Sequence, residues 1–247
     1  MAPAAQPGEA GAASGRGGMS AVVPDPDKPI DPEHTGGLRG RVVLGSPAPA
    51  PEPLLITGDS YCVGAASEAG GYVDESLRVR DGALAGAFVW VRSGLDGWEL
   101  PEPKGVVELD QRGCMYRPRV VGVVTGQTLR VLNSDGVLHN VHTKPKRNRA
   151  RNLAMPGEVL QRELQFKREE VMIELACDIH AWMKGWIGVV EHPFFCVTDE
   201  EGRWSLEGLP PGSYELGVWH ERLGTRALSV DVSVGEQTDT GDVTLTL

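Results

Sequence analysis

The chain has 247 residues, enough for one large domain or two of ordinary size. Its formal net charge of −10 argues against non-specific binding to nucleic acid or to an anionic membrane. No apolar run is long enough to span a bilayer, and the first residues lack the basic head and apolar stretch of a secretory signal. They are rich in Ala, Gly and Pro, so we expect residues 1–36 to form a disordered leader.

Short, β-branched runs separated by turn residues follow the leader. In chain order the predicted strands are 40–45, 87–91, 106–109, 120–124, 128–132, 159–166, 171–175, 186–190, 203–206, 213–219, 227–234 and 242–247. A spacing of roughly 8–12 residues is typical of β-sandwiches. No long amphipathic helix interrupts these runs, so the sequence predicts an all-β protein.

Charge is spread unevenly along the chain. Residues 106–192 hold 13 Lys or Arg against 10 Asp or Glu, a net charge of +3. The remainder holds 11 against 24, a net of −13, and the two parts sum to −10. A basic middle within an acidic frame suggests two structural units.

A group of possible metal ligands lies in the basic middle. Cys177, His180 and Met183 follow one another at intervals of three, between the predicted strands 171–175 and 186–190. Upstream, His139 offers a second imidazole after another strand. Each residue alone would usually belong to a core, but two imidazoles, a thiolate and a weak thioether together suit blue copper. Zinc fits less well, because structural zinc sites seldom include methionine.

The same region resembles a cupredoxin of the amicyanin and plastocyanin branch. The similar segments are Tyr116-x-Pro118, the turn 124–129, H-N-V-H at 139–142 and the C-x-x-H-x-x-M loop at 177–183. The resemblance implies a Greek-key sandwich over residues 105–192. It also implies one type 1 copper ion, held by His139, Cys177, His180 and Met183.

Further roles follow from the resemblance. Asn140 corresponds to the family's asparagine that joins the two ligand loops by hydrogen bonds. His180 would be the ligand nearest solvent, with Ala181 and Trp182 forming an apolar rim where a partner docks. The ligand loop departs from the family in having no proline. His142 fits a core or surface histidine better than a ligand.

Two kinds of copper protein are disfavoured by single residues. A binuclear site would need a second cysteine four positions away, where the chain has Ile173 and Ala181. A multicopper oxidase would have histidines on both sides of Cys177, where the chain has Ala176 and Asp178. We recognise no catalytic site and predict an electron carrier, not an enzyme.

A second stretch resembles the carboxypeptidase regulatory-like (prealbumin-type) β-sandwich. It contains the Asp-x-x-Gly turn at 199–202 and L-P-P-G-x-Y at 209–214. The family's opening strands have counterparts at 40–42 and 88–91, before the copper unit. We therefore expect a sandwich split between residues 37–104 and 193–247, with the cupredoxin inserted. The alternative is two sequential domains with 37–105 as a separate cap.

The remaining cysteines and histidines leave alternatives open. Cys62 and Cys114 form either a disulfide, which would require an oxidising compartment, or two buried thiols. Cys196 is expected in a core. His192 and His220 are candidates for a second metal site near the domain boundary.

The basic run 144–151 is either a solvated loop or a docking patch for an acidic redox partner. No aromatic platform accompanies it, which disfavours nucleic acid. The leading hypothesis is an extracytoplasmic (periplasmic or secreted) electron-transfer protein whose copper alternates between Cu(II) and Cu(I). The alternatives are a Cu(I)-binding or copper-delivery protein and a metal-free interaction module.

Overall fold

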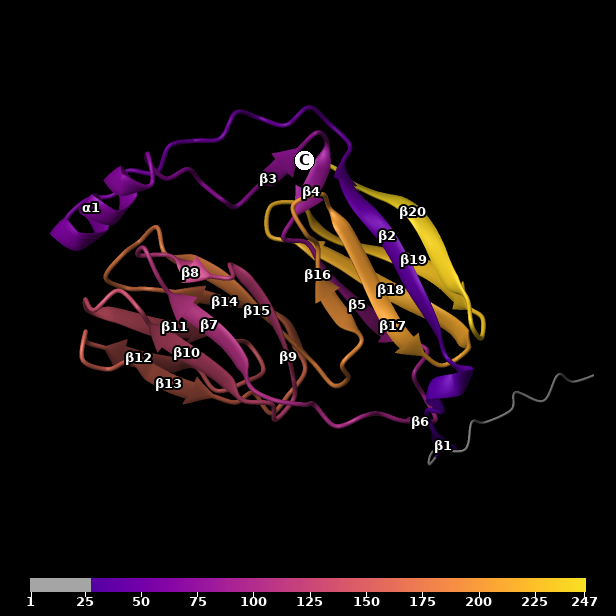
Figure 1. Ribbon diagram of the computed structural model, residues 1–247. Coiled ribbons are helices and arrows are strands. Elements are labelled where there is room, and N and C mark those ends of the chain that lie inside the picture. The colour runs from indigo at the N-terminus through magenta and orange to yellow at the C-terminus, as the bar shows by residue number, and fades with distance from the viewer. Residues whose placement is uncertain (1–27) are drawn as a thin grey trace, which may run out of the picture.

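A computed structural model describes residues 28–247, and Figure 1 shows that they are almost entirely β. The described residues contain one α-helix, α1 (Ser60–Glu68), and one short 3-10 helix, η1 (Pro32–His34). The prediction of an all-β protein is confirmed. No helix in this part of the chain is long and apolar enough to cross a membrane.

The middle of the chain folds into one sandwich, here called the central sandwich. Its strands are β7 (Val107–Gln111), β8 (Tyr116–Arg117), β9 (Val120–Val124), β10 (Leu129–Asn133), β11 (His139–Lys144), β12 (Arg151–Met155), β13 (Gln161–Leu164), β14 (Glu170–Ala176) and β15 (Lys184–Val190). One sheet has the order β13-β10-β7-β8 and the other β12-β11-β14-β15-β9. The apolar side chains of both sheets meet in a single core, which includes Val131, Val141 and Ile187.

The segments on either side of the central sandwich form a second one, here called the flanking sandwich. Its strands are β2 (Gly36–Leu44), β3 (Arg78–Arg80), β4 (Ala83–Ala85), β5 (Phe88–Ser93), β16 (Phe195–Val197), β17 (Arg203–Leu209), β18 (Gly212–His220), β19 (Gly224–Val232) and β20 (Gln237–Leu245). One sheet has the order β16-β5-β18-β19. The other runs β17-β2-β4-β3, with β20 also paired to β2. Strands from before and after the central sandwich therefore pair directly.

The two sandwiches share an apolar interface. Phe88 and Trp90 of β5 pack with Val120 and Val190 of the central sandwich in a separate buried cluster. A Cβ at Gly188 would lie 2.6 Å from the Phe88 ring, so only glycine allows this close approach. An ion pair between Arg119 and Glu221 crosses the same interface, with nitrogen and oxygen 2.6 Å apart.

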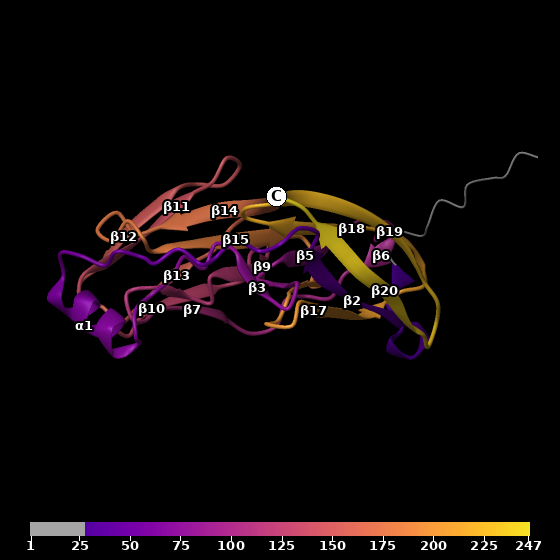
Figure 2. The ribbon, with the colours of Figure 1, turned by 90° about the horizontal axis from the view of Figure 1, so that it is seen from above.

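The chain between β2 and β3 leaves the flanking sandwich and carries α1 to the far end of the central one (Figures 1 and 2). The sequence did not predict this helix, because its small residues give no clear apolar face. Asp59 begins it: its carboxylate accepts hydrogen bonds from the backbone N–H groups of Tyr61 and Cys62. The excursion brings Cys62 to the predicted ligands.

The predicted leader falls mostly on residues 1–27, which lie outside the described residues. Its last part differs from the prediction, because residues 28–34 form β1 (Lys28–Pro29) and η1. β1 pairs in parallel with β6 (Trp98–Glu99). The Lys28 ammonium also lies 4.4 Å from the centre of the Trp98 ring, a contact that a sequence pattern does not reveal.

Candidate metal centre

Three of the predicted ligands converge at one end of the central sandwich. His139 is the first residue of β11, while Cys177 and His180 lie in the loop between β14 and β15. The Nδ1 atoms of the two histidines are 2.9 Å apart, and Cys177 Sγ is 3.8 Å from His180 Nδ1. The three residues are 0, 3 and 2% exposed. One ion could therefore be reached by both imidazoles and the thiol together.

The loop that carries Cys177 and His180 is closed by its own backbone. The N–H of Met183 donates to the His180 carbonyl at 2.9 Å, and the N–H of Cys177 donates to the Met183 carbonyl at 3.2 Å. Met183 is fully buried in the same core as Cys177. The structure thus places all four predicted ligands in one buried region, three of them as a compact group.

Asn140 connects the two segments that carry the ligands. Its side-chain oxygen accepts from the backbone N–H of Asp178 at 2.7 Å, and its amide nitrogen donates to the Asp178 carboxylate at 3.0 Å. The bonds hold the strand that begins at His139 against the loop that begins at Cys177.

Asp135, which was not predicted from the sequence, also belongs to this region: its carboxylate accepts a hydrogen bond from His139 Nε2 at 2.9 Å. Its side chain is fully buried. The only available signal was position, because Asp135 stands four residues before a predicted ligand. Aspartates in such turns usually face water, so no sequence pattern distinguishes Asp135 as a functional residue.

Hydrogen bonds within this group shift the protonation of two of the predicted ligands. Burial disfavours a charged His139, but its hydrogen bonds to Asp135 and Cys177 outweigh burial and raise its pKa to about 9. Burial also opposes ionisation of Cys177, yet hydrogen bonds from His139 and nearby backbone N–H groups lower the pKa of its thiol. Burial and the neighbouring His139 lower the pKa of His180. The site therefore favours a thiolate, the form that binds soft metals.

A disulfide between Cys62 and Cys114 covers the ligands on one side. Cys62 Sγ lies 3.6 Å from His180 Nε2, and the Trp182 indole N–H donates to the Cys114 carbonyl at 3.0 Å. The expectation that His180 is the ligand nearest solvent is therefore wrong. The 52-residue separation of the two cysteines gave no indication that Cys62 of α1 would lie beside His180.

The other histidines do not join the group. His142 faces away from it and contacts the Asp178 carboxylate at 2.8 Å. His192 donates from Nε2 to the Val91 carbonyl and accepts at Nδ1 from the Phe194 N–H, so both its nitrogens are engaged. Among residues 28–247 the clusters with metal-binding geometry include neither His192 nor His220, so the suggested second site is not formed.

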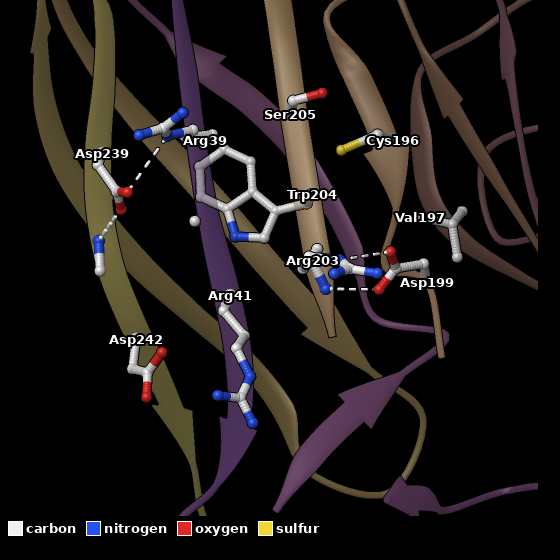
Figure 3. Close-up of a pocket in the computed structure, with 12 residues that line it drawn as sticks. Arg39, Arg41, Cys196, Val197, Asp199, Arg203, Trp204, Ser205, Asp239 and Asp242 are labelled. Carbon is white, nitrogen blue, oxygen red and sulfur yellow. Dashed lines mark hydrogen bonds and ion pairs between the residues drawn. The ribbon is translucent and has the colours of Figure 1, made fainter. Parts of the chain in front are cut away.

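A pocket of about 690 Å³ lies on the flanking sandwich, away from this group (Figure 3). Four of its charged side chains form ion pairs within the pocket: Arg39 with Asp239 at 3.2 Å and Arg203 with Asp199 at 3.1 Å. Cys196 also lines it, and burial raises the pKa of that thiol to about 12. Cys196 is thus an inert thiol, unlike Cys177.

The sequence matches no family model and no curated protein. Among solved structures, an amicyanin variant in the Cu(I) state is 21% identical, with 36% of this chain and 85% of that chain covered and a TM-score of 0.31. A purple cupredoxin from Nitrosopumilus maritimus is 19% identical, with 34 and 98% covered and a TM-score of 0.29. A copper-containing nitrite reductase from Thermus scotoductus is 23% identical, with 41 and 25% covered and a TM-score of 0.30.

Proposed function

We propose that the central sandwich is a cupredoxin-like domain with one type 1 copper site, and that the protein carries electrons. The observation behind this proposal is the convergence of His139 Nδ1, His180 Nδ1 and Cys177 Sγ in a buried group. The expected ligands are these three with Met183. Copper held there would supply reversible one-electron transfer between Cu(II) and Cu(I).

The donor set fits copper better than its main competitors. Thiolate and thioether sulfur favour Cu(I), and imidazole suits both oxidation states. Magnesium and calcium prefer oxygen ligands, which this group of three lacks. The hydrogen bonds that lower the pKa of the Cys177 thiol favour the thiolate that copper binds. The chain's own contribution is to hold these donors in place, because the closed loop and the Asn140 hydrogen bonds restrict their movement.

The enclosure of the site favours retention of the metal over its delivery. His180 and Cys177 are almost fully buried, and the Cys62–Cys114 disulfide fixes α1 over them. A protein that hands on Cu(I) needs its ligands open to an acceptor. Electron transfer needs only close approach, so the enclosed site is compatible with a carrier.

A redox partner would dock at the end that carries the copper ligands. Exposed apolar residues there are Tyr61 and Val63 of α1, Leu138 beside His139, and Ile179 beside His180. The basic run 144–151 begins at the other end of β11 from His139, six residues or roughly 20 Å along the strand. We therefore propose an apolar docking surface around α1, with the basic run as a solvated hairpin.

The disulfide also supports an extracytoplasmic location, because disulfides persist in oxidising compartments. Periplasmic or secreted residence is thus part of the proposal. Cys62 and Cys114 are both fully buried, so the bond is sheltered from reductants in solution.

The test is a visible absorption spectrum recorded during titration with Cu(II). We expect an intense thiolate-to-copper charge-transfer band that saturates at one equivalent. The Cys177→Ser variant should lose the band and the Cys196→Ser variant should keep it, since Cys196 lies in the flanking sandwich. A folded wild-type protein without the band would refute the proposal.

A second measurement separates a carrier from a delivery protein. Repeated reduction and oxidation in the presence of a Cu(I) chelator should leave the copper bound if the protein is a carrier. Rapid loss of Cu(I) to the chelator would favour delivery.

A further inference from the structure

Asp135 receives four hydrogen bonds at the end of the sandwich where the ligands lie. Oδ2 accepts from His139 Nε2 at 2.9 Å and from the backbone N–H of Cys114 at 2.8 Å. Oδ1 accepts from the backbone N–H of Gly113 at 2.6 Å and from the Tyr61 hydroxyl at 3.1 Å. A buried carboxylate is costly unless it is satisfied in this way, so its presence calls for a role.

The arrangement fixes the orientation of the His139 ring. An ionised carboxylate only accepts hydrogen bonds, so the His139 nitrogen that faces it must carry a proton. The proton on Nε2 leaves Nδ1 directed toward Cys177 and His180. Carboxylate partners of this kind orient metal-binding histidines and increase their basicity.

We propose that Asp135 is a positioning residue that fixes His139 for metal binding and lowers the reduction potential of copper held beside it. This inference rests on the copper site proposed above. A buried negative charge close to the ion stabilises Cu(II) more than Cu(I), and the burial of the Asp135 side chain keeps the effect strong. Because Tyr61 and Cys114 share the same carboxylate, Asp135 also links His139 to α1 and to the disulfide.

Glu163 provides a control carboxylate in the same sandwich. It lies in β13, its side chain is about half exposed, and it accepts a hydrogen bond from Arg130 at 3.0 Å. Its charge should therefore be screened by water.

The experiment compares Asp135→Asn and Glu163→Gln by redox titration and by competition for Cu(II) and Cu(I). In Asp135→Asn either orientation of the amide places an NH₂ group against a backbone N–H. We expect the affinity for Cu(II), relative to that for Cu(I), to fall by about 10- to 100-fold, so the potential rises. Glu163→Gln should change this ratio by less than about twofold.

An unchanged potential in Asp135→Asn, with the charge-transfer band intact, would overturn the role of Asp135 and leave the copper site standing. A wild-type protein without the band would overturn both. If Asp135→Asn does not fold, NMR of the Cu(I)-loaded wild-type protein provides the test. Nitrogen Nε2 of His139 should carry a proton that exchanges slowly with water, and an unprotonated Nε2 would contradict the proposal.

Discussion

Cys62 Sγ lies 3.6 Å from His180 Nε2, although the two residues are 118 positions apart in the chain. Cys62 lies in α1, on the segment between β2 and β3 that extends from the flanking sandwich, and His180 is a proposed ligand in the central sandwich. The contact therefore connects the two sandwiches. Cys62 also belongs to the core of the central sandwich. The two units are thus connected at the site as well as at their interface.

Removal of the disulfide should open the site. In a Cys62→Ser/Cys114→Ser variant we expect copper to be lost to a chelator at least about tenfold faster, because α1 is no longer held over His180. The free energy of unfolding should fall by about 4 kcal/mol for a loop of 52 residues. Chelator-exchange kinetics and urea unfolding without reductant measure the two effects. An unchanged exchange rate would show that α1 does not control access.

The apolar surface around α1 should govern electron transfer between molecules. Val63→Glu places a charge on this surface, so self-exchange between the Cu(I) and Cu(II) forms should slow by about tenfold or more. NMR line broadening measures this rate. Lys146→Glu, in the hairpin at the other end of β11, serves as the control and should have little effect. If only the Lys146 variant slowed the exchange, the docking surface would instead lie on the hairpin.

The ion pair across the interface should stabilise the molecule strongly. Arg119 and Glu221 are only 8 and 10% exposed, and Trp186 Nε1 also donates to Glu221. Glu221→Ala leaves a buried guanidinium without its partner and should cost about 3–5 kcal/mol of unfolding free energy. The exposed pair Arg92–Glu215 is the control, where Glu215→Ala should cost less than about 1 kcal/mol. If urea unfolding showed the same loss of unfolding free energy in both variants, the Arg119–Glu221 pair would not stabilise the interface more than an exposed pair does.

His220 should make stability depend on pH. Burial lowers its pKa to about 4 from 6.5, so the unfolded chain binds a proton more readily than the native protein. Its stabilising effect is complete above pH 6.5 and is lost as the pH falls toward 4. The loss should reach roughly 3 kcal/mol. Urea unfolding of the wild type and of His220→Gln at pH 7 and pH 4 measures this loss. If the free energy of unfolding fell equally in both proteins between pH 7 and pH 4, His220 would be ruled out as the cause.

The sequence predicted most strands and the ligand group, because both depend on local patterns. β9 (Val120–Val124) is a β-branched run bounded by turn residues, and Cys177, His180 and Met183 share one short loop. The cover over His180 was not predictable in this way. It depends on a nine-residue helix without a clear apolar face, which the long segment between β2 and β3 carries to the site. A disulfide then joins this helix to Cys114. Asp135 was missed because only tertiary packing turns its carboxylate inward.

The most direct test of the central claim is X-ray absorption at the copper edge of the loaded protein. The proposed site predicts one short copper–sulfur distance and two imidazole nitrogens around a single ion. In Cys177→Ser the short sulfur contribution should disappear. A wild-type spectrum with only nitrogen and oxygen neighbours would contradict the proposed site.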